Sequence, residues 1–83
     1  MSLAKGLDVV KLFAANSNNA YTAHEVVELT IASLWIAETW LREMHDIGLV
    51  HVAAWNSRGH PCYRWGAGPD VPAPNPRGNH EAN

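Results

Sequence analysis

The sequence of 83 residues lacks the features that define several common chemistries. Its single cysteine, Cys62, excludes an internal disulfide and a CxxC zinc motif. None of its five histidines stands at the HxxxH spacing of zinc enzymes. There is no Gly-rich phosphate loop, and no acidic residue has a matched base and nucleophile beside it. We therefore expect a protein that is not an enzyme and that holds no metal or cofactor.

Long apolar runs are also missing. No segment approaches the roughly 20 apolar residues that span a bilayer, and residues 1–5 lack the apolar stretch of a signal peptide. Together with the single cysteine, this predicts a cytoplasmic protein. Basic residues are few: six Lys and Arg stand against eight Asp and Glu, a net charge of −2. Most nucleic-acid-binding domains are basic, so the charge counts against that class.

What the sequence does contain is helical periodicity in its first half. Apolar spacing predicts helices over residues 3–15, 23–29 and 34–47. Thr22 and Glu25 form a capping-box pattern before the second helix, Ser33 is the expected N-cap of the third, and Gly48 ends it. A chain this short has a thin core, which four Trp residues enlarge. The expected core contains Leu12, Val26, Leu29, Ala37, Leu41 and Met44.

The second half changes to an extended pattern. Residues 49–55 and 62–65 are rich in β-forming residues, and residues 56–60 between them have turn composition, which predicts a two-stranded hairpin. Repeated prolines then follow and block regular structure. The sequence thus predicts an α+β domain over residues 1–66 and a flexible Pro-rich tail over residues 67–83.

Two stretches carry a family resemblance: residues 21–30, which begin YTAHEVV, and residues 40–50 with the preceding Ser33. A helix opening on Thr, a second opening on Ser and a Leu-Val strand after Gly resemble the winged helix-turn-helix family of small bacterial and phage regulators. The resemblance implies three helices and a hairpin wing, and a transcriptional regulator that binds double-stranded DNA, in many cases as a homodimer.

The resemblance also implies where DNA would bind. The third helix would enter the major groove and the wing would contact the sugar-phosphate backbone. The residues expected to contact DNA are Ser33, Leu34, Trp35, Glu38, Thr39 and Arg42 on the third helix, and Arg58, His60 and Arg64 on the wing.

Two departures from the family pattern suggest an alternative. Ile31 stands where the turn usually carries Gly, and residues 34–47 hold one Arg against three acidic residues. Such a helix opposes the phosphate neutralisation from which DNA affinity largely comes. The alternative is a winged helix that binds a protein through its acidic third helix. Trp35 then has three interpretations: packing on the domain's own core, an interface residue, or a contact with a thymine methyl or sugar.

The remaining aromatic residues have structural interpretations. We expect Trp40 to be partly buried between the third helix and the hairpin. Trp55 and Trp65 lie near the strand ends, where they face each other or close the open side of the core. Cys62 is expected as a small core residue rather than a reactive thiol.

Overall fold

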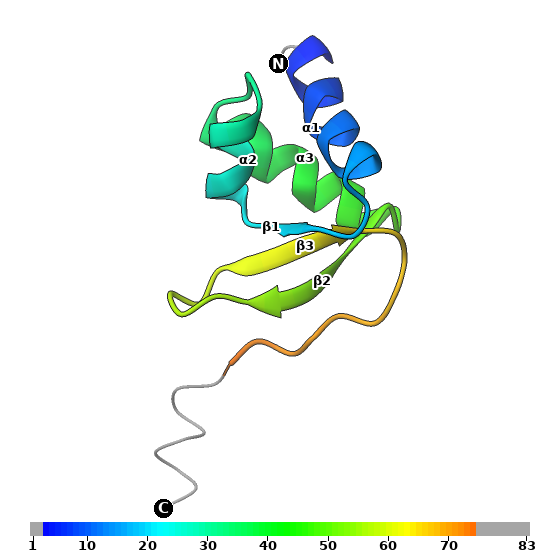
Figure 1. The fold of residues 1–83 in the computed structure, drawn as a ribbon, viewed down its shortest axis with the longest axis vertical. Helices are drawn as coiled ribbons and strands as arrows, with labels where there is room; N and C mark the ends of the chain where they lie inside the picture. Colours follow the sequence, from blue (N-terminus) through cyan, green and yellow to red (C-terminus); the bar gives the residue numbers. More distant parts are fainter. Residues whose placement is uncertain (1–2, 75–83) are drawn as a thin grey trace, which may run out of the picture.

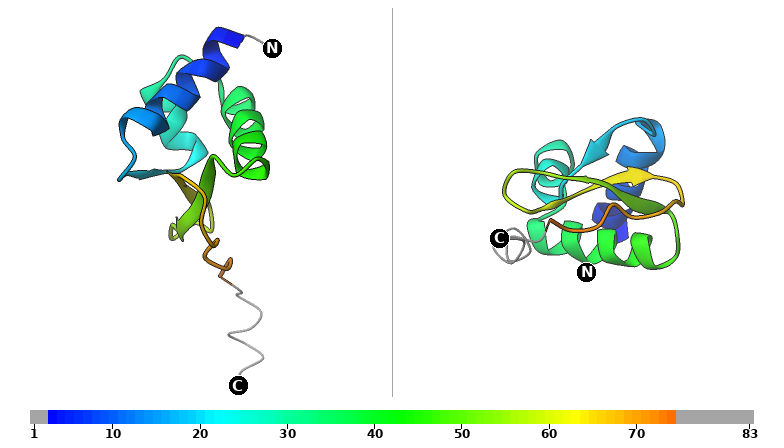
Figure 2. Two further views of the ribbon diagram at one scale, coloured as in Figure 1. Left: turned by 90° about the vertical axis from the view of Figure 1, so that its right-hand side faces the viewer. Right: turned by 90° about the horizontal axis from the view of Figure 1, so that it is seen from below.

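The computed structural model describes residues 3–74, which form an α+β fold of three helices and a three-stranded antiparallel sheet. The order is α1 (Leu3–Ala15), β1 (Ala20–Tyr21), α2 (Ala23–Leu29), α3 (Leu34–Asp46), β2 (Val50–Trp55) and β3 (Pro61–Trp65). The helices gather on one side of the sheet (Figures 1 and 2). None of the described helices is both long and apolar enough to cross a membrane.

The sheet differs from the predicted two-stranded hairpin. β2 and β3 pair antiparallel around residues 56–60, as expected, but β1 pairs with the other side of β3, giving the strand order β1-β3-β2. β1 has only two residues, Ala20 and Tyr21, which lie opposite Arg64 and Tyr63. Two residues are too few to produce a period-two pattern, so this strand could not be predicted from periodicity.

The predicted starts of α2 and α3 are confirmed by their caps, and α3 ends at Asp46, one residue before the predicted end. The Thr22 hydroxyl accepts from the Glu25 N–H at 3.2 Å, and the Glu25 carboxylate accepts from the Thr22 N–H at 2.8 Å, which completes the capping box. The Ser33 hydroxyl accepts from the Ile36 N–H at 3.4 Å and caps α3. Gly48 follows α3 with a φ of +82°, a conformation that glycine adopts without strain.

The turn between α2 and α3 is held by side chains rather than by a glycine. The Thr30 hydroxyl donates to the Val26 carbonyl at 2.7 Å and accepts from the Ala32 N–H at 3.2 Å. The Ile31 N–H donates to the Asp8 carboxylate of α1 at 3.0 Å. These bonds satisfy the backbone groups at the end of α2 and fix α1 against the turn, so Ile31 is accommodated where the family pattern has Gly.

The core lies between the helices and the inner face of the sheet. Of the predicted core residues, Val26, Ala37, Leu41 and Met44 are buried, and Leu12 is partly buried against them. The prediction is wrong for Leu29, whose side chain is 56% exposed. Leu29 is the last residue of α2, where the chain turns toward α3, and none of the described elements covers its side chain. The other buried apolar residues are Val9, Phe13, Ala32, Ile36, Val50 and Val52.

Trp40 is partly buried, as predicted, and its ring packs on α1. A Cβ on Gly6 would overlap the indole ring of Trp40, which means that the ring occupies the space left by the missing side chain. The position of Trp40 around α3, beside buried Ile36 and Ala37, directs it toward α1. Gly6 is buried in α1. A larger residue at this position would overlap the ring, so only glycine allows this contact.

The two strand tryptophans do not face each other. Trp65 lies opposite Val50 and packs against the core, whereas Trp55 lies at the far end of β2, opposite Pro61. Cys62, the second residue of β3, is partly buried but is not a member of the core cluster. Burial and the nearby Glu25 carboxylate raise the pKa of its thiol, which disfavours the reactive thiolate.

Residues 67–74 have no regular secondary structure, and residues 75–83 lie outside the described part of the chain. Asp70 and Val71 nevertheless form hydrogen bonds with β2: the Val52 N–H donates to the Asp70 carboxylate at 2.8 Å, and the Val71 N–H donates to the Val52 carbonyl at 2.9 Å. The predicted domain boundary after residue 66 stays a prediction.

The contact between Gly6 and Trp40 predicts that alanine is less stable than glycine at position 6, the reverse of the usual order inside a helix. Gly6→Ala should destabilise the protein by about 1–3 kcal/mol through overpacking, although Ala is about 1 kcal/mol better than Gly inside a helix. In a Trp40→Ala background the same change should be neutral or stabilising, since the ring is gone. A double-mutant cycle by urea unfolding measures this coupling. Equal effects of Gly6→Ala in both backgrounds would contradict the packing.

Candidate functional site

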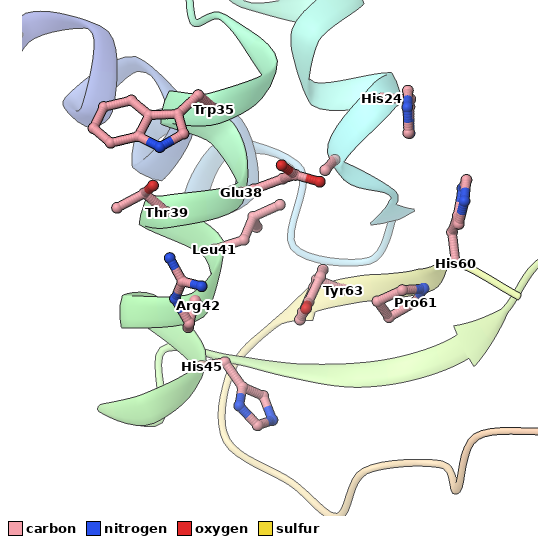
Figure 3. Close-up of a pocket in the computed structure, with 11 residues that line it drawn as sticks. His24, Trp35, Glu38, Thr39, Leu41, Arg42, His45, His60, Pro61 and Tyr63 are labelled. Atoms are coloured by element: carbon pink, nitrogen blue, oxygen red, sulfur yellow. The ribbon is translucent and has the colours of Figure 1, made fainter. Parts of the chain in front are cut away.

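A surface groove runs between α3 on one side and the start of α2 and β3 on the other (Figure 3). Its lining consists of Ala23, His24, Trp35, Glu38, Thr39, Leu41, Arg42, His45, His60, Pro61 and Tyr63. Figure 3 shows the α3 side chains forming one wall, with His24 and His60 facing them across the groove. The groove is lined by both signs of charge and by aromatic rings.

The α3 wall is built by helical spacing. Trp35, Thr39 and Arg42 stand at intervals of four and three residues, and Glu38 lies beside them, so all four share the outer side of α3. Burial of Ala37 and Met44 on the opposite side leaves this side exposed, and buried Leu41 lies between the two sides and also lines the groove. Trp35 is 64% exposed, which excludes the interpretation that it packs on the domain's own core.

The opposite wall contains two stacked histidines. The rings of His24 and His60 lie with centroids 5.1 Å apart and planes 14° from parallel. His60 ends the β2–β3 turn, and its position is fixed by Asn56, whose side-chain oxygen accepts from the N–H groups of Arg58 and His60, both at 2.9 Å. Gly59 completes the turn with a φ of +80°. The turn is therefore a locally braced structure, and the groove wall it supports has a defined shape.

Tyr63 is a partly buried residue of the groove, flanked by charged groups. Burial raises the pKa of its hydroxyl, the Asp70 and Glu38 carboxylates raise it further, and the Arg42 guanidinium opposes them. The ring of His45 meets the Tyr63 ring edge-on at 6.2 Å. Nε2 of His45 also lies 2.7 Å from Oδ2 of Asp70, which brings the residue 66–74 segment to the end of the groove.

The structure brings together only part of the predicted DNA contacts. Trp35, Glu38, Thr39, Arg42 and His60 line the groove. Leu34 is exposed at 36%, and the hydroxyl of exposed Ser33 is used as the helix cap.

The other two predicted cations lie elsewhere. Arg58 lines shallow hollows near the tip of the turn, outside the groove. Arg64 alternates along β3 with Tyr63 and Trp65, which pack against the core, so it faces away from the helices. The cations of the predicted wing are thus not on one face with Arg42.

Sequence reasoning missed three groove residues that carry a polar side chain. His45 was not included among the predicted contacts, although it stands three residues after Arg42. His24 and Tyr63 come from elements distant in sequence, and only the tertiary fold places them opposite α3. Among residues 3–74, no group of three or more His, Cys, Asp or Glu is arranged to hold a metal ion.

The raised pKa of Tyr63 predicts a loss of stability in alkali. An unfolded tyrosine ionises near pH 10, whereas native Tyr63 keeps its proton to higher pH. The contribution of the protonated Tyr63 hydroxyl to stability is therefore fully present below about pH 10. It is lost as the pH rises through the folded-state pKa. Tyr63→Phe should lose less stability than the unmodified protein between pH 9 and 11 in urea unfolding. Tyr21→Phe, outside the groove, is the comparison, and an identical pH slope for Tyr63→Phe and the unmodified protein would contradict the burial.

The chain was compared with known proteins. No protein-family model matches it, and neither the curated proteins nor the solved structures gave a match. Its function is therefore inferred from the fold and the groove.

Proposed function

We propose that this chain is a winged helix-turn-helix domain that binds double-stranded DNA as a small transcriptional regulator. The element order α1-β1-α2-α3-β2-β3 and the strand order β1-β3-β2 support a winged helix, with the β2–β3 hairpin as the wing. The short turn between α2 and α3 supports the helix-turn-helix. The observation that carries the proposal is the exposed outer face of α3, which shares one groove with His60 of the wing.

In this proposal α3 enters the major groove, since an α-helix fits its width of about 12 Å. Arg42 is the residue suited to a bidentate contact with guanine. Thr39 offers a hydroxyl, and Glu38 can accept from the amino group of cytosine. Leu34 and Trp35, at the first turn of α3, supply apolar surface for thymine methyl groups. The N–H groups of Arg58 and His60 donate to Asn56 and fix the shape of the β2–β3 turn, and in this proposal the turn contacts the phosphate backbone beside the major groove.

The acidic residues limit the strength of this binding. Glu38, Glu43 and Asp46 are exposed on α3, where Arg42 is the single arginine or lysine. Because each phosphate contact releases counterions, a helix with few cations gives a shallow salt dependence and weak non-specific binding. The proposal therefore implies that base contacts contribute more than usual to affinity, and that the domain discriminates sequences rather than coating DNA.

A second candidate function is protein binding, and one observation favours it. Trp35 is 64% exposed, and near it in the sequence Leu29 and Ile31 are exposed at 56% and 65%. Exposed tryptophans are typical of interface hot spots, and further exposed apolar side chains add to the surface that a partner can bury. The partner is then another protein, or a second copy of this chain in a homodimer.

The DNA proposal is tested by salt-titrated binding of three variants. Arg42→Ala should weaken binding by about 1–3 kcal/mol if Arg42 contacts guanine, and should relax preference at one base pair. Arg58→Ala should weaken all sequences alike and reduce the slope of log K against log salt by about 1. Arg64→Ala removes the same charge from the side facing away from the helices and is the matched control. It should change neither quantity much.

Two further results decide the proposal. Glu38→Gln should strengthen binding to non-specific duplex, since it removes a charge that repels phosphate. Absence of detectable duplex binding by the unmodified protein at low salt, where attraction is strongest, would refute DNA binding.

The protein-binding candidate makes a different prediction. Trp35→Ala should weaken binding to a partner by about 2 kcal/mol or more, the usual scale of a hot spot, and Arg42→Ala should have little effect. Ile47→Ala is the control, because Ile47 is a 73% exposed apolar residue just after the other end of α3. Sedimentation measures homodimer formation, and calorimetry measures binding to a different protein. Equal small effects of Trp35→Ala and Ile47→Ala would argue against this surface.

A further inference from the structure

We infer that residues 66–72 form a clasp that belongs to the folded domain, occupies the outer edge of β2, and keeps a second copy of this chain from pairing there. The inference does not depend on DNA binding, because it rests on the bonds between residues 66–72 and β2 and needs no ligand in the groove. It assigns a role to a Pro-rich segment that has no regular secondary structure.

The outer edge of β2 is where a strand of another molecule could pair with this sheet. β2 is an outer strand in the order β1-β3-β2, and its six residues, VHVAAW, are mostly apolar. An outer strand offers unpaired N–H and C=O groups to any other strand, and a long apolar edge of this kind favours intermolecular pairing. The opposite edge, β1, has only two residues and offers much less.

The clasp pairs with the centre of this edge. The Val52 N–H donates to Oδ1 of Asp70 at 2.8 Å, and the Val52 carbonyl accepts from the Val71 N–H at 2.9 Å. Both backbone groups of Val52 are therefore bonded by the clasp. The Asp70 carboxylate takes the position that a backbone carbonyl would have in a fourth strand.

Both ends of the clasp are also fixed. At its start, the Gly66 N–H donates to the Leu49 carbonyl at 2.6 Å, and Nδ1 of His51 lies 2.8 Å from the Gly66 carbonyl oxygen. Gly66 has a φ of +104°, which lets the chain reverse after β3. Farther along, the Trp55 indole N–H donates to the Val71 carbonyl at 2.7 Å. Figure 1 shows the segment returning from the end of β3 along β2.

Asp70 additionally connects the clasp to α3. Its second carboxylate oxygen lies 2.7 Å from Nε2 of His45, in the last turn of α3. The Val52 N–H and then His45 lower the pKa of the Asp70 carboxyl, so it stays ionised and keeps both acceptor oxygens in use. One side chain thus holds the sheet edge and the end of α3 together.

The clasp itself does not create a new pairing edge. Pro69 and Pro72 flank the two bonded residues, and proline has no N–H to donate to a further strand. A second strand added outside the clasp would therefore lack donors at both positions. Prolines and a charged residue on an edge are devices by which natural sheets prevent growth, and this segment contains both.

The test removes both bonds to Val52. Asp70→Ala deletes the acceptor and Val71→Pro deletes the donor; the matched control is Asp46→Ala with Ala73→Pro, the same changes at exposed positions. We expect the clasp variant to melt about 5 °C or more below the control, a shift of the size that small domains undergo when such contacts are lost. Sedimentation at equal concentration should show larger species than the control forms.

Each alternative outcome contradicts part of the inference. A melting temperature within about 2 °C of the control would mean that the clasp is not part of the folded unit. A folded clasp variant that sediments like the control would mean that the β2 edge does not recruit a second copy. If the variant does not fold, hydrogen exchange in the unmodified protein decides: the amides of Val52 and Val71 should exchange as slowly as those of the β2–β3 ladder. Exchange at the rate of exposed amides would overturn the clasp.

Discussion

The burial of one face of α3 is the constraint on which this structure depends. Ala37, Leu41 and Met44 lie at 0, 1 and 2% exposure, and with Val9 and Val26 they join the three helices in one core. Since a helix has only one such face to bury, the opposite side of α3 must remain exposed. The groove, with Trp35 and Arg42 on its wall, is therefore a direct result of core packing.

The charge of the groove decides which functions fit it. Arg42 is accompanied by Glu38 and by three histidines rather than by a cluster of Lys and Arg. A surface of this kind suits recognition through specific contacts more than attraction through net charge. The same mixture also suits a protein surface with Trp35 at its centre, and for this reason the charge of the helix and the exposure of the tryptophan have to be tested separately.

Local signals in the sequence predicted most of the fold. Apolar spacing, the helix caps at Thr22 and Ser33, the glycine at position 48 and the change to an extended pattern after it were enough to define the helices and the β2–β3 pair. They depend on neighbouring residues, which a sequence displays directly. β1 was missed because two residues carry no periodicity, and Leu29 was misplaced because helical spacing cannot tell where the covering elements end.

Contacts between distant residues could not be predicted in the same way. The packing of Trp40 on Gly6, the approach of His24 and Tyr63 to α3, and the bonds of Asp70 to Val52 and His45 all join separate elements. Proline composition indicated correctly that residues 69–74 have no regular structure. It carried no information about hydrogen bonds to β2, because an irregular backbone can still be fixed by its side chains.

The central claim, that the outer face of α3 and the wing form a DNA-binding surface, is tested most directly by NMR. Amide shifts of the unmodified protein would be followed while duplex DNA is added at low salt. The account predicts that shifts concentrate on Trp35, Thr39 and Arg42 and on residues 56–60, with α1 unaffected. Shifts that concentrate on α1, or no shifts at all, would contradict it.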